Sequence, residues 1–154
     1  MVHFYYAKRQ RSPGEKPILF TQILNQNADF QRLYRSGAFC SLGSALLYVR
    51  PNRLPYNRLG IPAGKKIGNA VKRNRAKRII REAYRAAEPL LPIGIDLVVV
   101  ARSSRPEQSS TVLTERFLTT GVKHCCGVSS GEIPCTPNPQ YNKKPRGRQA
   151  AKQS

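Results

Sequence analysis

The sequence predicts a small α+β domain, and three segments carry this prediction. Residues 69–87 form a basic segment whose apolar positions recur at helical spacing. Residues 95–101, IDLVVVA, are a near-continuous apolar run, which indicates a strand buried on both faces. Residues 111–123 form a second amphipathic helix, with Val112, Leu113, Phe117 and Leu118 predicted to point inward. The buried strand is expected to pair centrally with an earlier strand.

The elements expected before the basic segment are shorter. Asn27 is a candidate N-cap for a helix over 28–36 that ends at Gly37. Strands are expected over 38–41, 44–50 and 57–63, the last of them limited by Pro62 to an edge or a strand end. Residues 51–55 are rich in turn formers. The order is therefore helix, strands, helix, buried strand, helix.

The basic segment from 64 to 85 holds nine Lys and Arg residues and a single acid, Glu82. A helix face that is merely solvated interleaves Glu with Lys, and this one does not. Its apolar arc consists of Ala76, Ile79, Ile80, Ala83 and Ala87, and the opposite arc of Asn74, Lys77, Arg78, Arg81 and Arg85. One face is therefore expected in a core, while the other forms a cation array for a polyanion. The favoured polyanion is nucleic acid.

The whole chain has the same charge bias, with 27 Lys and Arg against 8 Asp and Glu among 154 residues. We expect a flexible basic arm over 1–17, an RNA-binding domain over 18–126 and a disordered basic tail over 127–154. No apolar run is long enough to cross a membrane, and the N-terminus does not resemble a signal peptide. The predicted location is the cytoplasm, with no membrane partner.

The four cysteines allow a zinc hypothesis that their spacing does not favour. His124, Cys125, Cys126 and Cys135 lie close in sequence, but adjacent cysteines do not have the usual ligand spacing. No metal site is therefore predicted in the protein. Cys40 lies in an apolar stretch and is expected to pack as a small hydrophobic side chain.

Residues 65–81 contain a motif that resembles the signature of the bacterial ribonuclease P protein subunit. Its parts are Lys65-Lys66-Ile67-Gly68-Asn69-Ala70-Val71, Arg73-Asn74-Arg75, Lys77-Arg78 and Arg81. A weaker resemblance extends from about 23 to 125. It implies a four-stranded sheet with three helices in the order α-β-β-β-α-β-α, containing a left-handed βαβ crossover.

The sequence shows no catalytic site. No two acids lie within five residues of each other, and the two histidines, His3 and His124, lie near predicted disordered ends. The resemblance implies the same, because in bacterial ribonuclease P the RNA is the catalyst and the protein is its accessory subunit. It also implies that magnesium is required by the RNA, that no cofactor is bound stably by the protein, and that one protein joins one RNA.

Two surfaces are predicted from the resemblance and the charge pattern. The first binds the catalytic RNA and comprises Lys65, Lys66, Asn69, Lys72, Arg73, Asn74, Arg75, Lys77, Arg78 and Arg81. Asn74 either contacts RNA or bonds the backbone at the helix start. The second binds the 5′ leader of precursor tRNA by stacking on Phe30, Tyr34 and Tyr48. Aromatic residues at this spacing are also typical of a core, and for Phe30 both interpretations stand.

The chain departs from the family pattern in two places. Ile61-Pro62-Ala63-Gly64 replaces a strand end that usually carries hydroxyl groups, and Thr21, Gln22, Asn25 and Gln26 replace basic residues before the first helix. Two other functions compete with ribonuclease P. A ribosomal or other structural RNA-binding protein fits the charge but not the motif, and a stand-alone nuclease is disfavoured by the scattered acids.

Overall fold

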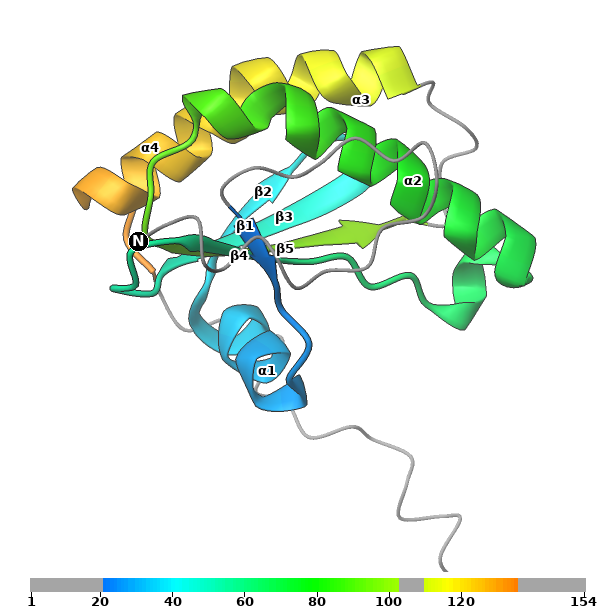
Figure 1. Cartoon of the computed structure of the whole chain (residues 1–154), viewed down its shortest axis with the longest axis horizontal. Coiled ribbons are helices and arrows are strands. Elements are labelled where there is room, and N and C mark those ends of the chain that lie inside the picture. The colour runs from blue at the N-terminus through cyan, green and yellow to red at the C-terminus, as the bar shows by residue number, and fades with distance from the viewer. Residues whose placement is uncertain (1–20, 103–109, 136–154) are drawn as a thin grey trace, which may run out of the picture.

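The computed structural model describes residues 21–102 and 110–135, which form a three-layer α+β domain. A sheet lies between α1 (Asn27–Ser36) on one side and a helical layer on the other (Figure 1). The helical layer contains α2 (Ala70–Ala87), α3 (Ser110–Arg116) and α4 (Val122–Ser130). None of the helices in the described ranges is long and apolar enough to cross a membrane.

The sheet has five strands in the order β1-β4-β5-β3-β2. They are β1 (Thr21–Ile23), β2 (Ala38–Ser41), β3 (Ala45–Pro51), β4 (Asn57–Gly60) and β5 (Ile95–Ala101). The predicted α+β class and the central position of β5 are confirmed: β5 runs parallel to β4 and antiparallel to β3. The predicted count of four strands is wrong, because β1 precedes α1 and pairs in parallel with β4. The left-handed crossover stays a prediction.

Polar contacts hold β1 against the end of α2. The Thr21 hydroxyl lies 2.5 Å from the Tyr84 hydroxyl and donates to Glu88 Oε1 at 2.9 Å. Tyr84 is fully buried, and this burial raises the pKa of its phenol far above the ordinary value, so the group stays neutral. β1 has only three residues and is fixed by partners far away in the sequence. It is therefore too short to show the alternating pattern by which a strand is predicted.

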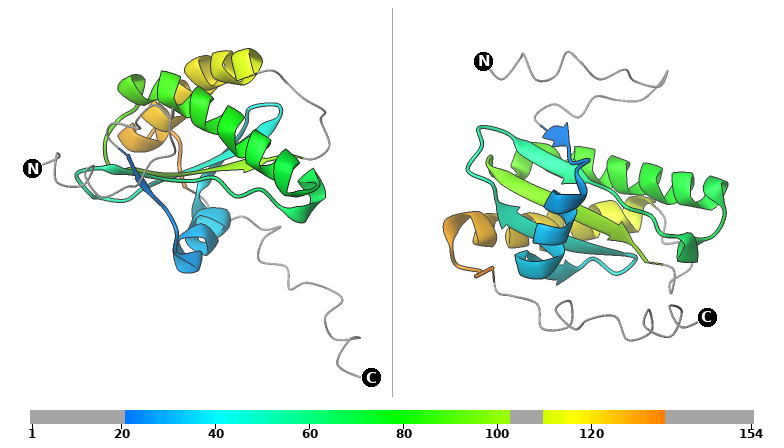
Figure 2. Two further views of the ribbon diagram at one scale, coloured as in Figure 1. Left: turned by 45° about the vertical axis from the view of Figure 1, so that its right-hand side comes forward. Right: turned by 90° about the horizontal axis from the view of Figure 1, so that it is seen from below.

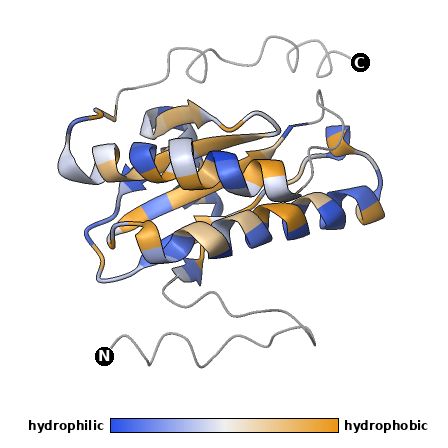
Figure 3. Cartoon of the chain, turned by 90° about the horizontal axis from the view of Figure 1, so that it is seen from above, coloured by the Kyte–Doolittle hydropathy of each residue, from blue (hydrophilic) through white to orange (hydrophobic). Residues whose placement is uncertain are grey.

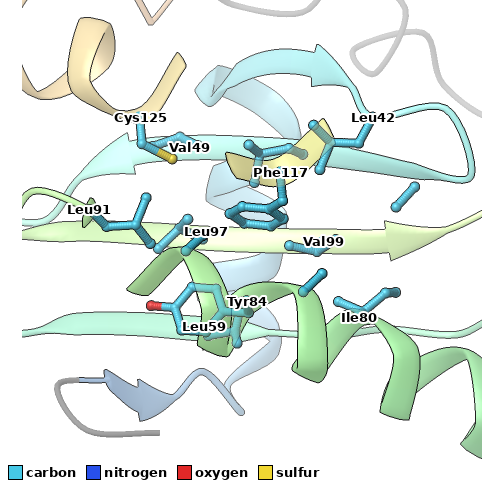
Figure 4. Packing of buried hydrophobic residues seen from close by; sticks show 14 of the residues in the cluster. Leu42, Val49, Leu59, Ile80, Tyr84, Leu91, Leu97, Val99, Phe117 and Cys125 are labelled. Atoms are coloured by element: carbon cyan, nitrogen blue, oxygen red, sulfur yellow. The ribbon is translucent and has the colours of Figure 1, made fainter. Parts of the chain in front are cut away.

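The main core fills the space between the sheet and the helical layer (Figure 4). β3 and β5 contribute Leu47, Val49, Leu97 and Val99, and α2 contributes Ile80, Ala83, Tyr84 and Ala87. The Tyr84 and Phe117 rings meet edge to face with centroids 6.0 Å apart. The apolar arc predicted for α2 is therefore buried from Ile80 onward, whereas Ala76 and Ile79 are half-buried.

A smaller core lies under α1, on the opposite face of the sheet. Leu33 of α1 and Val98 of β5 are both buried there. Seen from below, α1 lies across the strands (Figure 2, right). The helix ends at Gly37, as predicted, and a Cβ added there would lie 2.5 Å from the Leu33 carbonyl oxygen. Its first residue is Asn27 and its N-cap is Gln26, so the predicted capping by the Asn27 side chain is wrong.

The C-terminal helical segment runs further than the sequence predicts. α3 continues through a π-helical turn, η4 (Phe117–Gly121), into α4. Leu113 and Phe117 point into the core as predicted, but Val112 is exposed. The sequence predicts a disordered tail from 127 onward, and this boundary is wrong: Val128 is buried, and the Ile133 amide donates to the Gly127 carbonyl at 3.0 Å. The arm over 1–17 and the rest of the tail lie outside the described residues.

The Phe30 ring lies directly on the backbone of β4. A Cβ added at Gly60 would lie 2.5 Å from Phe30 Cε1 and 2.7 Å from its Cζ. We expect Gly60→Ala to displace this ring and to lower the free energy of unfolding by about 1–3 kcal/mol in urea titrations, as overpacking does. Gly64→Ala is the control, because open space surrounds Gly64 and its φ of −75° suits any residue. Equal losses in the two variants would contradict this packing.

Candidate nucleic-acid interface

The glycines and the asparagine of the motif shape the start of α2. Lys65–Ile67 form a short 3-10 turn, η2, which is followed by Gly68 at φ +133°. That backbone conformation is open to glycine and strained for other residues. Asn69 then caps α2, because its side-chain oxygen accepts a hydrogen bond from the Lys72 amide at 3.0 Å. The Gly-Asn pair therefore turns the chain sharply and starts the basic helix.

The first half of α2, Ala70–Ile79, contains no buried residue, and we refer to it as the projecting half of α2. Val71 within it is 75% exposed. Packing against the main core begins with the half-buried Ile79, and full burial begins at Ile80. Figure 3 looks down on the helical layer and shows hydrophilic residues recurring along its helices. The motif cations are thus presented on a helix that extends from the core.

The predicted cations lie together along η2 and α2, although their exposure differs. Arg73, Lys77 and Arg81 are half-buried, and the other members of the set are exposed: Lys65, Lys66, Asn69, Lys72, Asn74, Arg75 and Arg78. The helix-start role that remained open for Asn74 belongs to Asn69. Asn74 lies in the following turn with an exposed side chain. Exposed cations beside the amides of a helix start form a favourable site for phosphate.

Tyr34 and Tyr48 come together on the α1 side of the sheet. Their rings meet edge to face with centroids 5.2 Å apart, and both are half-buried. Burial raises the pKa of Tyr48, which keeps its phenol neutral. Phe39, which the sequence pattern does not single out, lies opposite Tyr48 on β2, and the two ring centroids are 5.4 Å apart. Its side chain is 53% exposed. The cross-strand register of β2 and β3 was the signal that would have found it.

Phe30 connects the two predicted surfaces. It packs against the small core and also lines a hollow of about 300 Å³ together with Lys77 and Arg81 of α2. The two interpretations of Phe30 therefore both apply. Thr21, Gln22 and Asn25, which replace basic residues of the family pattern, line the same hollow, as does Pro62. This end of the interface is polar on one wall and cationic on the other.

The residues considered as zinc ligands lie in different environments. His124 is buried with Nε2 at 3.1 Å from the Ala38 carbonyl oxygen, and Cys125 is buried in the main core, which raises the pKa of its thiol. Cys126 is exposed, although it is the next residue. Within 21–102 and 110–135, no three His, Cys, Asp or Glu residues are grouped so that they could hold a metal ion. Cys40 packs partly buried against the main core, as predicted.

Three carboxylates of the domain are occupied in structural contacts. Asp96 accepts hydrogen bonds from Arg58 Nε at 2.8 Å and from Arg58 Nη2 at 2.5 Å. This hydrogen bonding raises the pKa of Arg58. Asp29 accepts from Arg58 Nη1 at 3.3 Å, and Glu88 accepts from Thr21. These carboxylates hold the fold together, so the geometry fits a binding surface better than a hydrolytic centre.

Comparison with known proteins agrees with this geometry. The family model for ribonuclease P matches residues 21–124, from β1 into α4. The chain belongs to the ribonuclease P protein family. The match covers both predicted surfaces, and it ends before the last turns of α4 and the residues after that helix.

Relatives and solved structures show the same assignment. The ribonuclease P protein component of Lachnoclostridium phytofermentans is 39% identical over 112 residues, covering 73% of this chain and 96% of that protein. That of Natranaerobius thermophilus is 43% identical over 79 residues, covering 51% and 69%. The ribonuclease P protein structure from Thermotoga maritima superposes with a TM-score of 0.59 at 27% identity, covering 66% and 96%. That from Staphylococcus aureus superposes with a TM-score of 0.56 at 30% identity, covering 70% and 94%.

The two asparagines of the motif have separable roles. We expect Asn69→Ala to lower the free energy of unfolding by about 1 kcal/mol, because it removes the cap of α2, and Asn69→Ser to retain most of the stability. Asn74→Ala leaves stability unchanged, since alanine favours a helix interior, and weakens RNA binding. Urea unfolding and filter binding to the catalytic RNA measure the two effects. A destabilising Asn74→Ala beside a neutral Asn69→Ala would reverse the assignment.

Proposed function

We propose that this chain is the protein component of ribonuclease P, which binds the catalytic RNA and the 5′ leader of precursor tRNA. In this role it assists the endonucleolytic removal of the leader that gives the mature tRNA 5′ end. The observation that carries the proposal is the family motif along η2 and α2, where the fold exposes most of its cations. The alternative, a structural RNA-binding protein without a processing role, is not favoured by the family match.

The basic helix is proposed as the contact with the catalytic RNA. Guanidinium groups bind phosphate oxygens in pairs, which fixes the orientation of the RNA as well as its charge. Arg75 and Arg78 are exposed, and the preceding Lys65 and Lys66 add charge at the helix start. Cations at this position reduce phosphate repulsion, which magnesium otherwise has to screen.

The aromatic residues on the α1 side are proposed as the leader site. Bases of a single strand stack on exposed rings, and Phe39 offers the most exposed ring beside Tyr48 and Tyr34. The hollow at Phe30 supports a path from this site to α2, because Lys77 and Arg81 line its other wall. A strand stacked on the aromatic rings would then carry its phosphates toward the same helix that binds the catalytic RNA.

The chemistry is assigned to the RNA partner, with the protein as its accessory subunit. No residue of the protein is proposed as catalytic, no cofactor is proposed to be stably bound, and the magnesium belongs to the catalytic RNA. We also propose one protein for each RNA and a cytoplasmic location. The carboxylates of Asp29 and Asp96, bound to Arg58, support this division of roles.

Reconstitution tests the proposal directly. We expect the purified protein alone to leave precursor tRNA uncut and to lower the magnesium concentration at which its cognate ribonuclease P RNA cleaves. The measurement is the rate of 5′ maturation across a magnesium titration, with and without protein. Cleavage by RNA-free protein, or an unchanged magnesium requirement, would overturn the proposed function.

The two surfaces are expected to act on different steps. Replacing Arg73, Arg75 and Arg78 together by Ala lowers affinity for the catalytic RNA and reduces the slope of log K against log salt by about 2.7, since each of the three phosphate contacts contributes about 0.9. Phe39→Ala, at an exposed ring, spares assembly and weakens preference for precursor over mature tRNA by roughly tenfold for one lost stacking contact. Tyr34→Ala and Tyr48→Ala act in the same direction. If the arginine and the aromatic variants had equal effects in both assays, the two sets of residues would belong to one surface.

A further inference from the structure

A second basic hollow lies on the other flank of α1 from the aromatic residues. Phe30 and Tyr34 occupy one flank of this helix, and Asp29 and Arg32 occupy the other. The hollow has a volume of about 660 Å³. Its lining includes four arginines and a single acid: Arg32, Arg50, Arg53, Arg58 and Asp96. Neither the basic helix nor the aromatic cluster contributes to it.

The acids that line the hollow or bond its arginines do not neutralise it. Asp96 is 7% exposed and its oxygens are bonded by Arg58 and by Asn52 Nδ2 at 2.8 Å. Asp29 also bonds Arg58, and its contact with Arg32 is long, 3.4 Å, on an arginine side chain that is 56% exposed. An exposed ion pair of that length contributes little. Arg50 and Arg53 also line the hollow, and neither forms an ion pair with an acid among the residues that the structure describes.

The backbone holds one of these arginines in a costly conformation. Arg53 has φ +58° and is the only described residue other than glycine with a positive φ. The Asn52 side chain fixes this turn by accepting from the Leu54 amide at 2.7 Å and donating to the Tyr56 carbonyl at 3.2 Å. A side chain in the left-handed region is disfavoured by sterics, and Gly or Asn fits better. The position carries a cation at the hollow despite this cost.

The far wall of the hollow is formed by the residues that follow α4, and these lie beyond the family match. Ile133, Pro134 and Cys135 line it, with the Ile133 amide bonded to the Gly127 carbonyl. The Cys135 thiol lies 3.8 Å from the Val49 carbonyl oxygen, where β3 runs past its partner β2. Residues 136–154 contain Lys and Arg but no Asp or Glu, so this segment has no acidic side chain.

We propose that this hollow binds phosphate groups of an RNA strand, as a contact separate from both α2 and the aromatic cluster. Arg50 and Arg53 are the principal ligands, with Arg32 at the rim. Guanidinium groups that converge on an open polar hollow match phosphodiester oxygens, which accept paired hydrogen bonds. The proposal takes RNA as the source of phosphate from the proposed function. The strand is part of either the catalytic RNA or precursor tRNA.

The test uses the full-length chain with Arg50→Gln and Arg53→Gly combined. Glycine suits the positive φ at position 53, so the fold is expected to be retained. The salt dependence of binding is measured separately on the cognate catalytic RNA and on a single-stranded leader oligonucleotide. Arg116→Gln, which removes an exposed charge from α3 on the opposite face of the sheet, is the matched control.

We expect the slope of log K against log salt to fall by roughly 1.4 for two lost contacts with a single strand, and by somewhat more on a duplex region. A fall with one RNA identifies the source of the phosphate, and the control leaves both slopes unchanged. Slopes equal to those of the control on both RNAs overturn the proposal. Arg53→Gly alone, with an expected fall of about half that size, keeps the test decisive if the double variant is unstable. Failure of the magnesium assay would reject the proposed function without changing these slopes.

Discussion

The fold is organised around a strand that has no face turned to water. β5 is buried from Ile95 through Val99, so both faces of the sheet at its centre need an apolar cover. α1 supplies that cover through Leu33, and α2 with the C-terminal helices supplies it through Tyr84, Phe117 and their neighbours. Because the hydrophobic contribution grows with the area removed from water, neither layer can be lost without exposing this strand. The positions of the binding residues follow from that requirement.

Burial on both sides leaves three separate surfaces that we propose as contacts for RNA. The helical layer ends in the projecting half of α2, which carries the family motif. α1 divides the opposite face into an aromatic flank and an arginine flank, since Tyr34 and Arg32 point to different sides of the same helix. The Arg58 contacts with Asp29 and Asp96 fix α1 across the strands and so keep these flanks apart. α1 thereby separates the aromatic residues proposed for base stacking from the arginines proposed for phosphate binding.

The sequence predicted the elements whose signals are local, including β5, α2 and the cation set. It missed β1, because this strand has only three residues, and Thr21 is held by Tyr84 and Glu88, which lie far away in the sequence. It ended the domain at 126, since Ser and Gly dominate after that point, yet Val128 and Ile133 pack on the core. Phe39 could be selected only from the register of β2 and β3. The separation of Arg32 and Arg50 from the tyrosines could be predicted only from the position of α1 on the sheet. Each miss reflects a contact between residues far apart in sequence.

The shape of α2 has a mechanical consequence. Ten residues from Ala70 to Ile79 extend without a buried side chain, which at 1.5 Å per residue is a rod of about 15 Å. The exposed side chains on this stretch, among them Asn74, Arg75 and Arg78, are therefore held away from the main core. At its other end the helix continues into the buried residues Ile80 and Tyr84, and the Tyr84 hydroxyl meets Thr21 of the edge strand β1. One continuous helix therefore joins the exposed basic residues to the packing of the sheet.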